Sequence, residues 1–248
     1  MKKILIATFV NILTTMRIIG VFLLYPVYYS HGGVATAILA MLCYFTDLLD
    51  GLIARKAKVT TFFGSIYDTI ADKLFSVANL VILLTITRFA IIPILFEFVI
   101  VLIQIIKFNK NENIQSSLMG KIKTWIISFT IITVYLVTDI NSLTFLSSGF
   151  IEFINSCNEI HLMGVIFIPL YIFDVLTLLS YLKYLKTYNP KEKPAAPKID
   201  LYLKNPKNIK DVFINFSRLW LNHDFYEKYK DSAALRDIRR QVKANRED

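Results

Sequence analysis

The sequence predicts an all-α, polytopic membrane protein with six transmembrane helices. Of its 248 residues, 55% are hydrophobic, and the mean hydropathy of +0.51 exceeds the level usual for soluble chains. Apolar runs recur along the first three quarters of the chain, each near the ~20 residues that a helix needs to cross a bilayer. Basic side chains gather in alternate connecting segments, which is typical of a chain that crosses the membrane repeatedly.

The expected helices are defined by six apolar runs, at residues 8–29, 33–55, 62–86, 89–108, 119–138 and 164–186. Lys2 and Lys3 precede the first run. Arg17 interrupts it and no small-residue cleavage site is evident, so we interpret it as a retained helix rather than a signal peptide. A Pro- and Lys-rich stretch from Asn189 divides the chain into a membrane domain, 1–188, and a basic tail, 189–248. Within the tail, residues 208–221 and 224–245 are expected to be helical.

Loop charges predict the orientation of these helices. Nearly all loop lysines and arginines lie on one side, whereas the opposite loops hold only Arg88. By the positive-inside rule, we expect a multi-pass protein of the cell membrane with both termini in the cytoplasm. The long external loop, 139–163, carries apolar residues such as Phe145, Phe150 and Phe153, which suggests contact with the membrane surface.

Composition also argues against several other classes of protein. The net charge is +9, but half of the 28 Lys and Arg residues follow Tyr188, and no nucleic-acid-binding motif accompanies them. We therefore expect no nucleic-acid partner, and attraction of the tail to anionic lipid instead. The two cysteines, Cys43 and Cys157, provide no disulfide framework.

Four aspartates form the candidate site. Asp47 and Asp50 are three residues apart, and Asp68 and Asp72 are four apart, so each pair lies on one face of a helix. A charged side chain deep in a bilayer costs roughly 2.5–3.5 kcal/mol, and four such carboxylates would also repel one another. One or two bound divalent cations would offset both costs, and oxygen ligands suit magnesium, manganese or calcium.

Small and basic residues accompany the aspartates. Gly51 and Ala54 share the helix face of the first pair, and Gly64 shares that of the second. Small side chains there leave room for a ligand to approach the backbone. Arg55 supplies a cation with the bidentate geometry that phosphate favours. Together these features indicate phosphate chemistry.

The whole pattern resembles the signature of the CDP-alcohol phosphotransferase (CDP-alcohol phosphatidyltransferase) family. All eight fixed positions agree, with their spacings: Asp47, Asp50, Gly51, Ala54, Arg55, Gly64, Asp68 and Asp72. The resemblance implies a six-helix transferase, usually a homodimer, whose donor is most often CDP-diacylglycerol. An alcohol hydroxyl attacks the β-phosphorus of such a donor, and CMP leaves.

The resemblance also implies roles for the matched residues. Asp47, Asp50, Asp68 and Asp72 would hold two divalent cations, Mg²⁺ or Mn²⁺, and Asp72 would be the base for the hydroxyl. The CDP-lipid would be bound by the remaining four motif positions: Gly51, Ala54, Arg55 and Gly64.

Two shorter motifs point to the acceptor. Asn11-x-x-Thr14-x-x-Arg17 and Gly120-Lys121-x-Lys123-Thr124 are similar to segments of phosphatidylglycerophosphate synthases in this family. That similarity implies glycerol 3-phosphate as the acceptor, with its phosphate bound by three cations: Arg17, Lys121 and Lys123.

Other observations leave alternatives open. Phe96, Gln104 and Ile127 stand where such synthases usually carry Arg, Arg and Gln. Fewer cations would suit a lipid acceptor, so a cardiolipin synthase that uses phosphatidylglycerol is the runner-up. The intramembrane acids Glu97 and Asp174 are either functional or simple interhelical contacts. A UbiA-type prenyltransferase and a non-catalytic membrane protein are the remaining alternatives.

Overall fold

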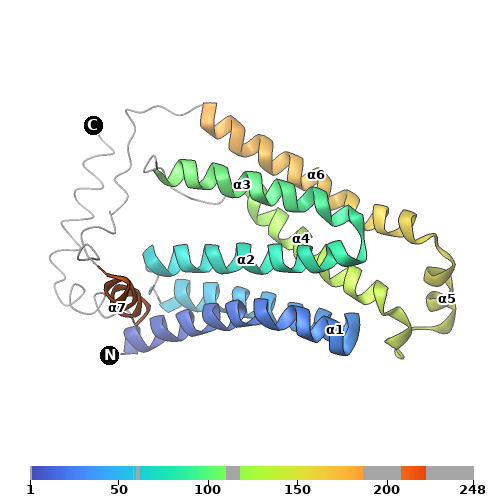
Figure 1. Cartoon of the computed structure of the whole chain (residues 1–248), viewed down its shortest axis with the longest axis horizontal. Helices are drawn as coiled ribbons and strands as arrows, with labels where there is room; N and C mark the ends of the chain where they lie inside the picture. Colours follow the sequence, from blue (N-terminus) through green and yellow to red (C-terminus); the bar gives the residue numbers. More distant parts are fainter. Residues whose placement is uncertain (1, 58, 60–61, 110–117, 187–207, 222–248) are drawn as a thin grey trace.

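The computed structural model describes residues 2–57, 59, 62–109, 118–186 and 208–221, which form helices and short connections (Figure 1). The α-helices are α1 (Lys2–Ala57), α2 (Phe62–Ile86), α3 (Ile91–Asn109), α4 (Leu118–Thr138), α5 (Ser148–Ser156), α6 (Glu159–Lys186) and α7 (Ile209–Trp220). Two short 3-10 helices, η1 (Arg88–Ala90) and η2 (Ile140–Ser142), lie in the connections. The all-α prediction is confirmed for this part of the chain.

Helix α1 contains the first two predicted helices, joined at a bend. Gly32 has φ 80° and ψ −171°, a left-handed conformation that glycine adopts without the steric cost of a side chain. The amide of Val34 donates to Asp139 Oδ2 at 3.3 Å, so an acid from the α4–η2 junction caps the second half. We call residues 2–31 and 33–57 the first and second arms of α1. Both arms run along the bundle, so their outer ends lie at the same end (Figure 1).

Four helices in the described residues are long and apolar enough to cross a membrane. They correspond to Leu5–Ala54, Tyr67–Ile86, Met119–Thr138 and Glu159–Lys183, and the first is a 50-residue segment that includes the bend. These helices indicate a membrane-embedded protein. Many large apolar side chains on their outer faces are exposed, as expected for surfaces that contact lipid.

The core lies where α1, α2, α4 and α6 meet. Helix α1 packs against α2 and α4, and α6 packs against α4 and α3. The buried cluster includes Phe75 of α2, Tyr135 of α4 and Phe167 of α6, each with no exposed surface. This packing fixes the position of the two helices that carry the aspartates, α1 and α2.

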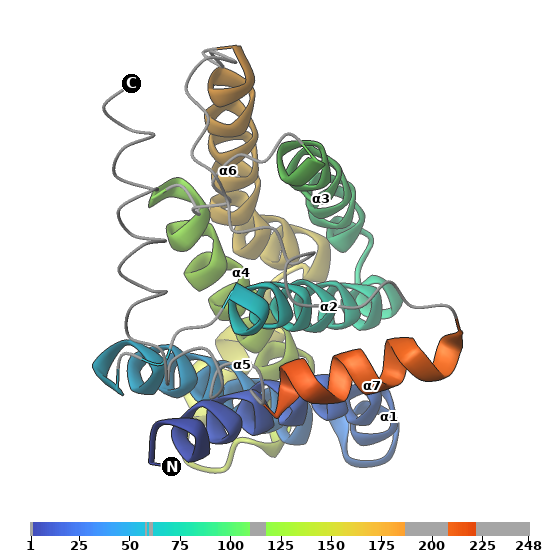
Figure 2. The same ribbon diagram turned by 90° about the vertical axis from the view of Figure 1, so that its left-hand side faces the viewer.

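The described part of the tail, residues 208–221, is helical where the sequence predicts it. Helix α7 lies within the predicted segment 208–221 and runs across one end of the bundle, as the two views show (Figures 1 and 2). The second predicted tail helix, 224–245, lies outside the described residues.

Candidate active site

The four aspartates come together at the end of the bundle that also holds the chain's N-terminus. Asp47 and Asp50 lie in the second arm of α1, and Asp68 and Asp72 lie in the N-terminal half of α2. Each pair faces the other because the second arm and α2 are joined by a short connection and pack side by side. The sequence-predicted cluster of acids is thus formed by two neighbouring helices.

Arg17, from the first arm of α1, binds all four carboxylates. Its Nη2 lies 2.7 Å from Asp47 Oδ1 and 2.9 Å from Asp50 Oδ2, and its Nη1 lies 3.0 Å from Asp68 Oδ1 and 2.8 Å from Asp72 Oδ1. The Arg17 side chain has no exposed surface. A planar guanidinium with its fork of donors suits such multiple pairing.

Close approach of the two arms allows this contact. Gly20 lies one turn beyond Arg17, and a Cβ added there would sit 2.8 Å from Sγ of Cys43, itself one turn before Asp47. A larger residue at position 20 would push the arms apart. The glycine therefore helps to place the guanidinium of Arg17 between the acids of the other helices.

One guanidinium does not balance four carboxylates. The side chains of Asp68 and Asp72 are 39% and 34% exposed, whereas that of Asp50 is 2% exposed, so the cluster is open on its α2 side. Asp47, Asp50 and Asp68 each offer one oxygen within 4.8 Å of the others, a spacing that one metal ion could bridge. Carboxylate oxygens are the ligands that hard divalent cations such as Mg²⁺ and Mn²⁺ prefer.

Thr14 and Asn11 continue the buried polar face of the first arm. Asn11, Thr14 and Arg17 are spaced three apart and are 3%, 2% and 0% exposed. The Thr14 hydroxyl donates to Asp50 Oδ2 at 3.3 Å, which fixes that carboxylate further. Asn11 Nδ2 instead donates to the carbonyl of Trp220 in α7 at 2.7 Å.

The small residues of the predicted lipid pocket stay beside the aspartates. Gly51 and Ala54 are half-buried on the second arm, and Gly64 is half-buried one turn before Asp68. The side chain of Arg55 lies outside the described residues.

The two predicted acceptor lysines point in different directions. Lys121 is exposed at the start of α4, whereas Lys123 is 3% exposed. Lys123 Nζ lies 2.9 Å from Glu97 Oε1 and 2.7 Å from Asp174 Oδ1. Lys73 Nζ adds a third contact, 2.6 Å from Glu97 Oε2. Glu97 and Asp174 therefore each form an ion pair with a lysine of another helix. This agrees with the interpretation of both acids as interhelical contacts.

A sequence profile of the CDP-alcohol phosphatidyltransferase family matches residues 7–156, more than half of the chain. The matched segment contains Arg17 and all four aspartates. The chain belongs to the CDP-alcohol phosphatidyltransferase family.

Several members with known names are similar to this chain. The CDP-diacylglycerol–glycerol-3-phosphate 3-phosphatidyltransferase of Bacillus subtilis is 37% identical over 95 residues, which cover 37% of this chain and 49% of that protein. The enzyme of the same name from Wigglesworthia glossinidia brevipalpis is 33% identical over 123 residues, or 45% of this chain and 68% of that protein. A cardiolipin synthase (CMP-forming) from Oryza sativa is 41% identical over 81 residues, or 32% and 25%. The chain thus spans between a quarter and about two thirds of these curated relatives.

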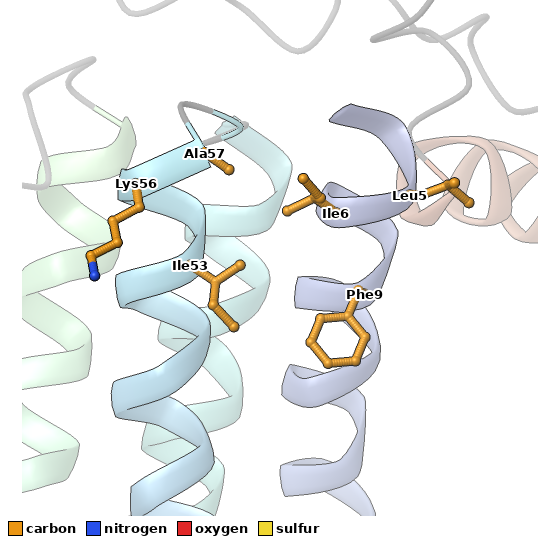
Figure 3. Close-up of a pocket in the computed structure, with 6 residues that line it drawn as sticks. All are labelled: Leu5, Ile6, Phe9, Ile53, Lys56 and Ala57. Carbon is orange, nitrogen blue, oxygen red and sulfur yellow. The ribbon is translucent and has the colours of Figure 1, made fainter. Parts of the chain in front are cut away.

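An apolar groove lies near the aspartate cluster. It has a volume of about 550 Å³ and lies between the outer ends of the two arms of α1. Ile6 and Phe9 of the first arm face Ile53 and Ala57 of the second, while the Lys56 ammonium points away (Figure 3). Ile53 is one turn beyond Asp50, so this wall of the groove follows the first pair of aspartates along the second arm.

Sequence reasoning did not predict two contacts of the site. It named Arg17 as an acceptor-binding residue, but the pairing of Arg17 with the four aspartates depends on how the two arms pack. An arginine within an apolar helix does signal a nearby acid, but it does not say which one. The contact between α7 and the first arm was also not predicted.

Proposed function

We propose that this chain transfers a phosphatidyl group from CDP-diacylglycerol to glycerol 3-phosphate, which yields phosphatidylglycerophosphate and CMP. The observation that carries the proposal is the four-aspartate cluster around Arg17 within the family-matched segment. The names of the Bacillus and Wigglesworthia relatives support the choice of acceptor.

The donor set supports two divalent cations, Mg²⁺ or Mn²⁺. Asp47, Asp50 and Asp68 would share one ion, and Asp72 would help to hold a second. When bound, the ions would neutralise the pyrophosphate and the charge on departing CMP. Arg17 alone leaves a negative excess at the cluster, which favours the binding of further cations there.

Asp72 is proposed as the base. Its side chain is one-third exposed and its Oδ1 is held by Arg17 at 2.8 Å, so the carboxylate is oriented yet reachable. In the transfer, the acceptor oxygen forms a bond to the β-phosphorus, the phosphorus–oxygen bond to CMP breaks, and the hydroxyl proton passes to Asp72.

Substrate contacts are proposed for the remaining motif residues. Gly51, Ala54, Arg55 and Gly64 would bind the CDP-lipid, beside the apolar groove of α1. Arg17 was expected to bind the acceptor phosphate, but its buried guanidinium already pairs with four carboxylates, which favours a role in holding the cluster. Lys121 is exposed at the N-terminus of α4 and would attract the anionic acceptor. The existing pairs of Lys123 with Glu97 and Asp174 favour a structural role for that lysine.

The topology is part of the same proposal. The two arms of α1, together with α2, α3, α4 and α6, would make six crossings, with both termini and the site at the cytoplasmic face of the cell membrane. The loop-charge asymmetry supports this orientation. A homodimer is proposed from the family resemblance.

Cardiolipin synthesis from phosphatidylglycerol is the second candidate. The cardiolipin synthase of Oryza sativa favours it, because its identity to this chain, 41%, is comparable to the 37% and 33% of the Bacillus and Wigglesworthia enzymes. The absence of arginine at Phe96 and Gln104 points the same way.

An acceptor panel tests the proposal. The purified protein receives CDP-diacylglycerol, Mg²⁺ or Mn²⁺, and one acceptor at a time: glycerol 3-phosphate, phosphatidylglycerol, serine or inositol phosphate. We expect CMP release and a phosphatidylglycerophosphate product with glycerol 3-phosphate alone, and none from an Asp72→Asn control. Turnover with phosphatidylglycerol instead would overturn the acceptor, and no CMP release with any acceptor would overturn the reaction.

A further inference from the structure

Helix α7 is an amphipathic helix that lies across the end of the bundle near the aspartates (Figure 2). It follows the family-matched segment, which ends at residue 156. Asn208 and Asp211 form a capping box at its N-terminus, so its start is well defined.

The C-terminal half of α7 is bound to the bundle. The carbonyl of Trp220 accepts from Asn11 Nδ2 at 2.7 Å, and Trp220 Nε1 donates to Thr15 Oγ1 at 3.1 Å. Phe216 packs edge-on against Tyr67 of α2, with ring centroids 6.1 Å apart. These contacts fix the helix at Asn11, one turn from Thr14, and at Tyr67, next to Asp68.

The N-terminal half of α7 instead exposes apolar side chains. Ile209 is 79% exposed, Phe213 is 71% and Val212 is 51%. Their spacing of three and four residues places them on one side of the helix. Lys210 and Arg218 are also exposed, and they lie on other sides of it.

The apolar side of α7 meets a strip of exposed apolar residues on α2. Tyr67, which contacts Phe216, begins a face that continues through Ile70, Leu74 and Val81, each about half exposed. In a membrane-embedded bundle this strip contacts acyl chains, and it ends where α7 crosses. The continuity of the two apolar surfaces selects lipid as the occupant of the α7 face.

We propose that α7 is an interfacial helix whose Ile209, Val212 and Phe213 enter the boundary between headgroups and acyl chains of the bilayer. Lys210 and Arg218 then lie toward headgroup phosphates and water. The N-terminal half of α7 would then contact lipid while its C-terminal half contacts the bundle. In this way α7 would anchor the end of the bundle that holds the aspartates to the membrane surface. The inference rests on the membrane insertion of α2 included in the proposed function.

Spin-label accessibility of the full-length protein in nanodiscs tests the inference. Single cysteines replace Ile209, Val212 or Phe213, with Lys210→Cys and Arg218→Cys as matched controls, in a Cys43→Ala, Cys157→Ser background. The nanodiscs contain phosphatidylcholine and phosphatidylglycerol. We expect labels at the three apolar positions to collide several-fold more with oxygen than with a water-soluble nickel chelate, and the two control labels to show the reverse preference.

A label at Leu74→Cys separates this inference from the membrane placement of the bundle. If Leu74 reports lipid while all five α7 labels report water, the inference about α7 is overturned and the membrane placement of α2 stands. If Leu74 itself reports water, the insertion in the proposed function fails. Labels at Ile209, Val212 and Phe213 that are shielded from both reagents would show protein against this face and would also overturn the inference.

Discussion

At the scale of single residues, the site is an arrangement of charge. Arg17 is buried, and its guanidinium bridges acids from two other helical segments. Removing one partner of a buried ion pair costs about 3–5 kcal/mol because the other charge is left uncompensated. Here the guanidinium of Arg17 faces four carboxyl groups, so the cluster can bind further cations.

Asp72 and Asp68 are expected to differ in what they contribute. Asp72→Asn should lower turnover about 10²- to 10⁴-fold, the usual contribution of a general base. Asp68→Asn should raise the metal concentration required more than Asp72→Asn does, because it removes an oxygen from the three-carboxylate group. CMP release measured against Mg²⁺ concentration distinguishes the two. Glu152→Gln, an exposed acid in α5, is the matched control.

The role of Asp68 and Asp72 is contradicted if either variant keeps near-normal turnover at saturating Mg²⁺ and Mn²⁺. Such a result would show that catalysis does not depend on a metal site formed by these aspartates.

Arg17→Gln should make stability depend on the divalent cation. Without the guanidinium the four carboxylates repel, so we expect a loss of about 3–5 kcal/mol in chelator, and partial recovery in millimolar Mg²⁺. Thermal unfolding in detergent with and without Mg²⁺ measures both. Arg88→Gln, at an exposed position of η1, controls for loss of charge. An equal loss under both conditions would mean that no cation replaces Arg17.

At the scale of elements, the bend in α1 brings Arg17 to the aspartates. Gly32 takes the positive φ at the bend, and Asp139 lies against it and caps the second arm. The two arms can then run side by side, with Gly20 against Cys43.

Gly32→Ala should destabilise the protein. The left-handed conformation costs an L-residue roughly 1–2 kcal/mol, and the new Cβ would sit 2.9 Å from Asp139 Oδ2. Gly149→Ala in α5 is the control, because a Cβ there meets nothing within 4 Å. The midpoint of thermal unfolding should fall for Gly32→Ala alone. Equal midpoints for both variants would contradict the importance of the bend.

The ion pairs of Glu97, Lys123 and Asp174 hold α3, α4 and α6 together. Lys123→Met should cost about 3–5 kcal/mol because it leaves Asp174 buried without a cation. Adding Asp174→Asn should recover part of that loss, and Lys121→Met, exposed in the same helix, should have little effect. Unfolding midpoints of these variants and of Asp174→Asn alone test this. Additive losses in the double variant would show that the pair does not couple.

At the scale of the whole molecule, the outer faces of the long helices expose many apolar side chains, and the aspartate cluster lies at one end of the bundle. Helix α7 crosses that end of the bundle (Figures 1 and 2) and contacts Asn11 and Tyr67 there. The groove lies between the two arms of α1 at the same end. A lipid donor and a water-soluble acceptor could both reach a site in this position.

Thiol labelling tests the orientation. In a Cys157→Ser background, in which Cys43 stays buried, Leu221→Cys should react with a membrane-impermeant maleimide only after cells are opened. Thr144→Cys, at an exposed polar position beyond α4, should react on intact cells. The loop charges are the reason for this expectation. Labelling in the reverse pattern would invert the proposed topology.

Much of the architecture could be predicted from local signals. The apolar runs predicted the long helices to within a few residues, because length and hydrophobicity are properties of consecutive residues. The predicted helices 8–29 and 33–55 correspond to the two arms of α1, which the non-helical Gly32 separates. The i, i+3 and i, i+4 spacings likewise placed each pair of aspartates on one helix face.

Pairings between distant residues were decided by tertiary structure. Arg17 and Asp72 are 55 positions apart, and Asn11 and Trp220 are 209 apart. Lys121 and Lys123 look equivalent in the sequence, yet one is exposed and the other is buried between two acids. Helix periodicity states which residues share a face, but the partner of that face depends on how the helices pack. The sequence alone therefore determined the helices and the acids of the site, and only their packing decided which cation neutralises which acid.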